Sequence, residues 1–548
     1  MARAADLLAE CLAAQGFDRL FCVPGESYLA LLDALMGSPV ETVVCRHEGG
    51  AGLMAVADAK LTGRPGLCAA SRGPGATNLS IALHLAEQDA VPLVALIGQV
   101  ARWERGLGAF QEVDYGRFYG EMAKGVWEVT DADRLPETLA RAVRLARSGT
   151  PGPVVIALPE DMLSDETEAR PLGPMPVPSS PPGPEAMDAA AEMLAKAKRP
   201  LLIAGSGCAA PEARAALARA AEAHHLPVAL TFKQQHLLDN DSPHYAGHLG
   251  FKIPAFQVEA LAEADLILAV GTRLGDTPTQ GFTLPRAPEP DQPLIHVHPD
   301  PDRVGAVHKA SLGLAADPGA FLAALAARNA EVDEGRREWT AKLNAVARRL
   351  RGKDPQPRED GLDFGHMVKA LAAHAPRDAV VTMDAGNFSG WLHAHWPWDG
   401  TQDAVGAVGG AMGLGVPAAV AASLRDPARR AIAFTGDGGA LMTGSELATA
   451  AATGAKPIVV ISDNGTYGTI RLHQEKAYPG RVHGTALANP DFAAWGRSFG
   501  ALGLTVETPE DAEAAAKAAL AHDGPAVIHV KASAEAISPY ATIAELRA

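Results

Sequence analysis

Short apolar runs that end in glycine-rich or acidic turns recur along the whole chain, each followed by an alanine-rich segment of helical character. In the first third of the chain they include TVVCRHE, GLCAASRG and VPLVALIGQV, and PVVIALPED closes the series near residue 161. Near-continuous apolar strands that alternate with helices are typical of parallel sheets with helices on both faces. The pattern therefore predicts an α/β fold built from doubly wound parallel sheets.

The chain has 548 residues, which is too long for one hydrophobic core and suggests roughly three domains. The segment PLGPMPVPSSPPGP at 171–184 is too rich in proline to join a sheet and predicts an extended linker. The strand–helix rhythm resumes at RPLLIAGSGC, and the loop PQPREDG precedes a third series that begins near Leu362. We predict three domains, at 1–165, 185–330 and 360–548.

Composition excludes several classes of function. The formal net charge is -16 and no basic cluster interleaved with aromatic residues occurs, so we expect no nucleic-acid partner. No uncharged apolar run reaches membrane-spanning length, and the N-terminus predicts an amphipathic helix and not a signal peptide. We therefore expect a cytoplasmic protein without membrane contact. The scattered cysteines have no metal-ligand spacing and predict buried reduced thiols. They are Cys11, Cys22, Cys45, Cys68 and Cys208.

Two oxygen-bearing side chains stand at the ends of consecutive apolar runs in the last domain. AIAFTGDGG places Asp437 directly after one run, and KPIVVISDNGT places Asn464 after the next. If the two strands are neighbours, both side chains emerge at the same edge of the sheet. A carboxylate, an amide oxygen and a nearby backbone carbonyl suit a Mg2+ ion that keeps part of its coordination shell for phosphate oxygens. The glycines let a phosphate approach the N-terminus of the following helix.

This pair of motifs resembles that of the thiamine-diphosphate-dependent enzymes, and the resemblance covers nearly the whole chain, most closely to the acetolactate synthase-like branch. It implies a pyrimidine-binding domain, a middle domain and a diphosphate-binding domain, in that order. It also implies thiamine diphosphate and Mg2+ as cofactors, with the metal held by Asp437, Asn464 and the main-chain oxygen of Thr466. The other residues that the resemblance assigns to the cofactor are Gly386, Asn387, Gly410, Met412, Gly436, Gly438, Gly439, Tyr467 and Gly468.

Glu48, in TVVCRHEGGAG, matches the glutamate that the family places against N1′ of the aminopyrimidine. A carboxylate hydrogen bond to that nitrogen favours the imino tautomer, whose other nitrogen can then take the weakly acidic thiazolium proton. The segment GAFQEVDYGRF resembles another family segment, which implies that Phe110 and Gln111 face the reacting carbon. In SRGPGATN, Gly73, Pro74 and Gly75 are interpreted as loop architecture, and the role of Asn78 stays open.

In this family the cofactor lies between the first domain of one subunit and the last domain of its partner. The resemblance therefore implies a homodimer or a homotetramer with its active sites at the subunit interface. The sequence itself departs from acetolactate synthase in three places.

Two of these departures concern the second substrate and a flavin. His473 stands where biosynthetic acetolactate synthases have a Trp that selects the second keto acid, so we do not expect 2-ketobutyrate as acceptor. Tyr467, Thr469 and Ile470 are further candidates for lining this pocket. The middle-domain segment GTRLGDTPTQGF has lost most of the Asp/Arg pattern of the FAD-containing branch. We therefore do not expect FAD, although the glycines of AGSGC keep it as an alternative.

The third departure is Glu26 in FCVPGESYL, where a strand is expected to end and a helix to begin. A carboxylate at a helix start is favoured by the helix dipole, which would account for Glu26 without any chemistry. Acetolactate synthases usually have a glycine at this place, whereas pyruvate decarboxylase-like enzymes have an aspartate that works as an acid or a base. The resemblance therefore favours proton handling or substrate gating by Glu26 near the thiazolium carbon.

Four functions remain open on the sequence. The expected one is a carboligase that decarboxylates a 2-keto acid such as pyruvate and joins the remainder to a second carbonyl compound. A decarboxylase or C–C lyase would protonate the remainder and release an aldehyde, and Glu26 favours this alternative. A C–C hydrolase of a cyclic diketone would use the same cofactor. A non-catalytic relative is disfavoured, because Glu48, Asp437 and Asn464 are all present.

Overall fold

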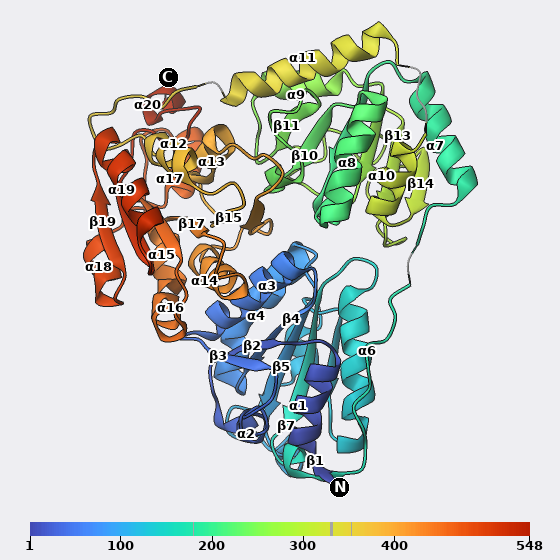
Figure 1. The fold of residues 1–548 in the computed structure, drawn as a ribbon, viewed down its shortest axis with the longest axis vertical. Helices are drawn as coiled ribbons and strands as arrows, with labels where there is room; N and C mark the ends of the chain where they lie inside the picture. The colour runs from blue at the N-terminus through green and yellow to red at the C-terminus, as the bar shows by residue number, and fades with distance from the viewer. Residues whose placement is uncertain (179, 329–331, 352, 548) are drawn as a thin grey trace. The chain divides into compact units, whose positions relative to one another are not determined.

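The computed structural model describes residues 1–178, 180–328, 332–351 and 353–547 (Figure 1). They form three six-stranded sheets, and β1 (Ala2–Arg3) pairs separately with β8 (Glu166–Thr167). The predicted α/β fold, with three domains of parallel sheet flanked by helices, is confirmed. Packing groups the chain into two compact units, which are described separately. The first unit contains Met1–Val177, Pro355–Trp391 and Val405–Ala548, and the second contains Pro178–Asp354 and Leu392–Ala404.

The first sheet of the first unit is parallel and corresponds to the apolar runs of the first third of the chain. Its strands are, in order, β3 (Glu41–Val44), β2 (Arg19–Cys22), β4 (Gly66–Ala70), β5 (Leu93–Gln99), β7 (Pro153–Pro159) and β6 (Gly125–Glu128). Helices α3 (Glu48–Thr62), α4 (Gly73–Gln88) and α5 (Tyr115–Tyr119) bury one face, and α1 (Ala4–Ala14), α2 (Leu29–Ala34) and α6 (Leu135–Arg147) bury the other. Because parallel neighbours end at the same edge, the residues that follow β2, β3 and β4 converge there.

The second sheet of the first unit contains the runs that end in the GDG and DNG motifs. Its strands are, in order, β16 (Asp403–Gly406), β15 (Val380–Met383), β17 (Ala431–Gly436), β18 (Ile458–Asp463), β20 (Ala526–Lys531) and β19 (Leu502–Val506). Helices α14 (Gly415–Arg425), α15 (Asp437–Thr443), α16 (Leu447–Thr453) and α18 (Phe492–Ser498) contribute to one apolar core, and α12 (Gly365–His374) packs against α19 (Pro509–Ala521). The remaining helices are α13 (Ser389–His395), α17 (Gly468–Ala477) and α20 (Ile543–Arg547).

The second unit contains the third sheet, which is also parallel. Its strands are, in order, β11 (Tyr245–Leu249), β10 (Val228–Thr231), β9 (Pro200–Ala204), β12 (Leu266–Val270), β13 (Leu294–His298) and β14 (Leu312–Ala315). Helices α7 (Pro184–Lys196), α8 (Pro211–His224) and α10 (Pro318–Ala326) bury one face, and α8 and α10 lie side by side (Figure 1). Helices α9 (Ala255–Ala262) and α11 (Glu334–Arg351) bury the other face.

Three sequence predictions concern segments outside the sheets. The proline-rich segment 171–184 has no helix or strand before Pro184 among its described residues, and residue 179 lies outside them. The five cysteines are all buried and free. Within the part of the chain that the structure describes, no helix is both long enough and apolar enough to cross a lipid bilayer.

Helix α3 is the central element of the first unit because it is buried from Gly49 to Ala59. It packs on β4, against α4 and against α14, which covers the second sheet. Such close packing requires small side chains. A Cβ atom at Gly52 would overlap Leu79 and Ala82 of α4, and one at Gly66 of β4 would overlap the carbonyl oxygen of Ala55. The run GGAGLMAVADA therefore lacks an amphipathic pattern because it has no solvent-facing side.

An ionic contact also joins α3 to the end of α14. Arg425 donates from Nε to Asp58 Oδ1 at 2.7 Å and from Nη1 to Asp18 Oδ2 at 2.8 Å. Hydrogen bonds from Arg425 and Arg64 hold the pKa of Asp18 well below its usual range, although partial burial opposes this. The two sheets of the first unit are thus joined by a shared apolar core and by a charged contact at its margin.

We predict that Gly66→Ala lowers the free energy of unfolding by about 1–3 kcal/mol, because the added methyl group would force α3 away from β4. Urea denaturation followed by circular dichroism would measure the loss. Gly173→Ala is the matched control, since a Cβ atom at Gly173 would meet open space. Equal stability of the two variants would show that α3 does not depend on this close approach.

Candidate active site

The carboxyl ends of β2, β3 and β4 bring Glu26, Glu48 and Arg72 to one edge of the first sheet. Glu48 begins α3 and is half-buried. Asn78 of α4 donates from Nδ2 to Glu48 Oε2 at 2.9 Å. A Cβ atom at Gly75 would lie 3.1 Å from Glu48 Oε1, so the glycine lets α4 approach this carboxylate closely. Asn78, whose role stays open on the sequence, is therefore the side chain that orients Glu48.

Glu26 begins a short 3-10 turn, Glu26–Tyr28, and its side chain is 67% exposed. Arg72 donates from Nη2 to Glu26 Oε1 at 2.6 Å and from Nη1 to Glu160 Oε2 at 3.1 Å. Arg72 itself is buried, and within the described part of the chain its Nε has no hydrogen-bond partner. A helix dipole is therefore an incomplete account of Glu26, since an ion pair holds its carboxylate beside the edge that carries Glu48.

The two residues predicted to face the reacting carbon have different surroundings. The main-chain oxygen of Gln111 accepts a hydrogen bond from the amide of Gly73 at 3.0 Å, which holds the loop against the N-terminus of α4. Gln111 adopts a left-handed backbone conformation with φ of 64°. Phe110 is 73% exposed. The structure thus brings Gln111 to the edge that carries Arg72, whereas Phe110 extends into solvent.

The second edge lies at the ends of β17 and β18, which pair directly in parallel, as the spacing of the motifs predicts. Asp437 follows β17 and begins α15, and Asn464 follows β18. Gly436 is aligned with Ser462, so Asn464 follows one residue beyond the level of Asp437 on the neighbouring strand. The side-chain oxygen of Asn464 accepts from the amide of Thr466 at 3.2 Å, which folds the DNGT turn back on itself.

Asp437 is a buried carboxyl group with neutral hydrogen-bond partners. It accepts from the amide of Gly438 at 2.9 Å and from Asn489 Nδ2 at 2.8 Å. Burial raises the pKa of Asp437 to about 6. A carboxylate in such a place is stabilised by a cation, so the donor set at this edge suits a divalent metal ion.

Asn489 also joins Asp437 to a second carboxylate. Its Nδ2 donates to Asp463 Oδ1 at 2.8 Å, and Asp463 Oδ2 is 2.7 Å from His529 Nε2. Although burial opposes it, hydrogen bonds from His529 and Asn489 and the charge of Lys531 hold the pKa of Asp463 well below its usual range. Asn489 and His529 were not predicted as site residues, because they lie in no recognisable motif, and neither was Asp463, although it is the first residue of the DNG motif.

The loop after β15 provides a hydrogen-bond donor at the same edge. Asn387 Oδ1 accepts from Thr469 Oγ1 at 3.0 Å, and the amide nitrogen of Asn387 donates to the same hydroxyl at 3.1 Å. Asn387 Nδ2 is buried and has no hydrogen-bond partner among the residues that the structure describes. Gly386 has φ of 157°, which favours glycine. A buried amide donor without an acceptor fits a phosphate oxygen.

Close packing surrounds the other predicted cofactor residues. A Cβ atom at Gly438 would overlap the ring of Tyr467 and lie 3.5 Å from Met412 Cε, so these three residues meet at the start of α15. Met412 is half-buried, and Gly410 is exposed with φ of 73°. His473 lies exposed on α17, the helix that follows the DNGT turn.

The glycines of the middle domain are explained by packing. A Cβ atom at Gly207 would lie 2.8 Å from Gly271 Cα, and one at Gly205 would lie 2.6 Å from the oxygen of Gly271. The loops after β9 and β12 therefore contact each other through their backbones. This backbone contact accounts for the two glycines of AGSGC, which were the sequence-based reason for keeping FAD as an alternative.

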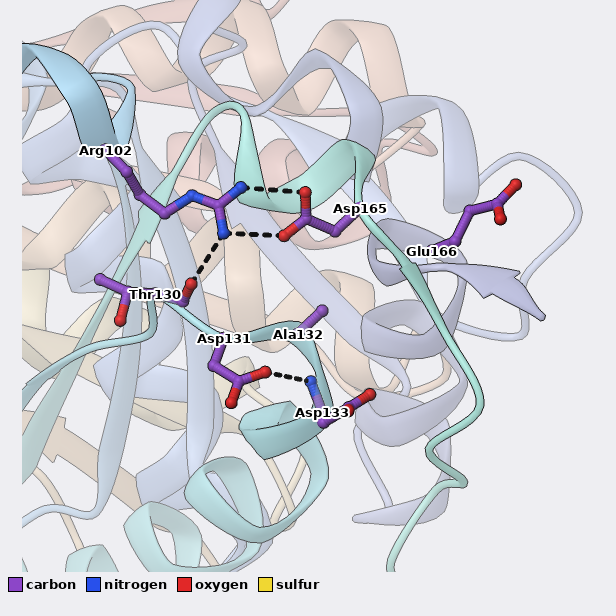
Figure 2. A pocket seen from close by; sticks show the side chains of 7 residues that line it. All are labelled: Arg102, Thr130, Asp131, Ala132, Asp133, Asp165 and Glu166. Carbon is purple, nitrogen blue, oxygen red and sulfur yellow. Dashed lines mark hydrogen bonds and ion pairs between the residues drawn. The ribbon is translucent and has the colours of Figure 1, made fainter.

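A separate polar cavity of about 350 Å³ opens on the first domain (Figure 2). Arg102 in its wall pairs with Asp161 and Asp165 and donates to the main-chain oxygen of Thr130. Asp131 accepts from the amide of Asp133. Arg102 is thus paired with acidic side chains and Asp131 with a main-chain amide, and none of these residues was predicted as a site residue.

The sequence matches three family descriptions that together cover most of the chain. Residues 2–118 match "Thiamine pyrophosphate enzyme, N-terminal TPP binding domain", residues 187–325 match the central domain, and residues 384–530 match the C-terminal TPP binding domain. The two edges described above lie in the first and third of these regions. The chain therefore belongs to the thiamine pyrophosphate enzymes.

Individual relatives define the branch of the family. The chain is 32% identical over 529 residues to the acetolactate synthase isozyme 2 large subunit of Escherichia coli (strain K12), a match that covers 96% of this chain and 95% of that protein. It is 33% identical over 542 residues to the acetolactate synthase large subunit of Parasynechococcus marenigrum (strain WH8102), covering 95% and 86%. A thiamine pyrophosphate-containing protein of Bacillus subtilis (strain 168) is 31% identical over 540 residues, covering 96% and 91%. The chain is an enzyme of the acetolactate synthase-like branch.

Proposed function

We propose that the protein is a thiamine-diphosphate- and Mg2+-dependent enzyme that decarboxylates a 2-keto acid and ligates the remainder to a second carbonyl compound. The observation that carries this proposal is the full-length similarity to acetolactate synthases, in a chain that keeps both the Glu48 edge and the Asp437–Asn464 edge. The domain boundaries 1–165, 185–330 and 360–548 and a cytoplasmic location remain part of the proposal, and the buried free thiols favour that location.

Asp437, Asn464 and the main-chain oxygen of Thr466 would hold the Mg2+ ion. The buried Asp437 carboxyl group lacks a cationic partner among its hydrogen-bond donors, and the unpartnered Asn387 Nδ2 would donate to the diphosphate. Gly436, Gly438, Gly439 and Gly468 would let the diphosphate approach the start of α15 and α17. Gly386 would lie at the phosphates, and Gly410, Met412 and Tyr467 would contact the rest of the cofactor.

The chemistry that thiamine diphosphate supplies when bound is an acidic thiazolium carbon and an electron sink for decarboxylation. Glu48 would hold a proton at the pyrimidine nitrogen. Because Asn78 occupies Glu48 Oε2, the other oxygen, Oε1, is the one that would face the cofactor. Gln111, placed beside Gly73, would offer its amide to an oxygen of the substrate, and Phe110 would help to exclude water once its exposed ring is covered.

The subunit arrangement is also a proposal. We infer a homodimer or homotetramer in which Glu48 of one chain faces Asp437 of another. Several large apolar side chains are exposed on the elements that carry the two edges, which supports burial of these elements against a second copy. They are Trp103, Leu107, Phe110, Leu441, Met442 and Ile470.

A specific observation favours an aldehyde-releasing decarboxylase or lyase as the second candidate. Glu26 places an exposed carboxylate at the edge that carries Glu48, and Arg72 orients it. Such a group could deliver or remove a proton at the reacting carbon. His473, which is exposed on α17, would be a further residue of the acceptor pocket. Hydrolysis of a cyclic diketone remains the third candidate.

We expect purified protein with thiamine diphosphate and Mg2+ to convert pyruvate to acetolactate, and chelation of the metal to abolish the reaction. Separation of products by chromatography distinguishes the candidates. Acetaldehyde as the main product would favour the lyase over the carboligase. Turnover of a cyclic diketone, with neither product formed from pyruvate, would favour the hydrolase.

Glu26→Gly is expected to shift the product ratio from aldehyde toward ligated product, because it removes the proton-handling group. Glu26→Gln is the matched control for stability. Since Glu26 is 67% exposed, its ion pair with Arg72 should contribute no more than about 1 kcal/mol to stability, which a urea titration would check. An unchanged product ratio and rate in Glu26→Gly would exclude a chemical role for this carboxylate.

Glu48→Gln and Asp437→Asn variants are each expected to lose activity. If each active site uses Glu48 from one chain and Asp437 from another, co-expression of the two variants should restore roughly one quarter of the wild-type activity. This follows because half of randomly assembled dimers contain both variants and keep one of two sites intact. Absence of any recovery, with mixed dimers demonstrated by differential tagging, would place the complete site within a single chain.

A further inference from the structure

Glu446 is a fully buried carboxylate that lies far from Glu48 in sequence but next to it in the fold. It ends the 3-10 turn Gly444–Glu446 of the last domain. Its Oε1 accepts from the main-chain amides of Arg46 at 3.1 Å and His47 at 3.0 Å, and its Oε2 accepts from Thr449 Oγ1 at 2.6 Å. These two amides immediately precede Glu48 at the start of α3. Burial raises the pKa of Glu446, which its hydrogen bonds oppose.

The first domain makes the reverse contact through Asp89 at the end of α4. The side chain of Asp89 is 0% exposed and is paired with Lys60 of α3. Asp89 Oδ1 accepts from the amide of Gly409 at 2.8 Å, and Oδ2 accepts from the amide of Val408 at 3.2 Å. Lys60 Nζ donates to the main-chain oxygen of Gly406 at 2.7 Å. This segment leads directly into Gly410 and Met412.

Both contacts have the same form. A buried carboxylate of one domain accepts two consecutive main-chain amides of the other, and the residue expected at the cofactor follows immediately in the chain. The backbone is closely packed at both contacts. A Cβ atom at Gly50 would collide with the Glu446 carboxylate, and one at Gly409 would lie 2.8 Å from Gln88 Cβ. Charged acceptors make shorter and stronger hydrogen bonds to amides than neutral ones.

We propose that Glu446 and Asp89 are positioning residues for cofactor binding. Glu446 fixes the backbone that presents Glu48, and Asp89, with Lys60, fixes the backbone that presents Gly410 and Met412. This inference rests on the proposed function, in which those three residues contact thiamine diphosphate. Each carboxylate is occupied by main-chain amides, so each would act through the loop that it holds and not by contact with the cofactor.

Glu446→Gln and Asp89→Asn test the inference with little change in volume. In Asp89→Asn the new NH2 group faces a main-chain N–H in either orientation and cannot accept from it. In Glu446→Gln the NH2 group at the Oε2 position faces the amide of Arg46, which donates to that oxygen at 3.2 Å, and the remaining acceptor loses its charge. We expect the affinity for thiamine diphosphate, titrated with saturating Mg2+ and followed by tryptophan fluorescence, to fall by about tenfold or more in each variant. Glu446→Asp, which keeps both oxygens one methylene further back, should fall between wild type and Glu446→Gln, and it serves if the Gln variant does not fold.

Asp58→Asn is the matched control. Asp58 is also a buried acid of α3 that joins the same two domains, but it pairs with Arg425 and holds no cofactor loop. The Asp58→Asn variant should lower the melting temperature and leave the affinity for thiamine diphosphate unchanged. In a Glu48→Gln background, Glu446→Gln should weaken binding little further, because its effect passes through Glu48.

The outcomes separate two failures. Affinities in Glu446→Gln and Asp89→Asn that match that of Asp58→Asn, at comparable losses of melting temperature, would overturn this inference and leave the proposed function intact. Failure of the wild-type protein to bind thiamine diphosphate would overturn the proposed function and the inference together. A full tenfold loss of affinity from Glu446→Gln in the Glu48→Gln background would also overturn the inference, since Glu446 would then act on binding by a route other than Glu48.

Discussion

The first unit depends on the burial of α3. This helix is enclosed by β4, α4 and α14, and it is held there by residues small enough for backbones to meet, such as Gly52 and Gly66. One apolar core therefore runs from the first sheet through α3 to α14 on the second sheet. Because Glu48 is the first residue of α3, the position of the catalytic candidate is set by the same packing that joins the two sheets. Interiors packed this densely tolerate little displacement, so Glu48 is placed by the core and not by a mobile loop.

Buried carboxylates restrain main-chain amides that apolar packing leaves unrestrained. Apolar contacts fix the axis of a helix, but they leave the main-chain amides at its ends without directional restraint. Glu446 and Asp89 provide that restraint at the places where each domain presents its cofactor residues. Burying a carboxylate is unfavourable unless it is hydrogen-bonded, and here each acid accepts two amides. An apolar side chain would fill the same space without the unfavourable burial of a charge. The position of each acid beside a proposed cofactor loop therefore supports a role in holding that loop.

The sequence predicted the parts of the site that follow strand ends with a recognisable pattern. The parallel α/β sheets, the pairing of the strands before Asp437 and Asn464, and the placement of Glu48 at a strand end could all be inferred from apolar runs and turn residues. Asn78, Arg72, Asn489 and Glu446 could not, because each is an ordinary polar residue whose partner is distant in sequence or lies on another element. Glu26 shows the same limit. Its position at the end of β2 was predictable, but its ion pair with Arg72 depends on which strands are neighbours.

The ion pair of Glu26 bears on what the second substrate can be. Glu26 and Glu160 share the single guanidinium of Arg72, so this corner of the edge carries more negative than positive charge. Glu26 is the exposed member, and its carboxylate faces the solvent from which a second substrate would arrive. A fixed negative charge disfavours an anionic partner relative to a neutral one. This charge would favour a proton or a neutral carbonyl compound over a second 2-keto acid, so it supports the aldehyde-releasing candidate and weighs against acetolactate as the product. If the proposed carboligation is correct, the acceptor is the substrate for which we expect this chain to differ from its acetolactate synthase relatives.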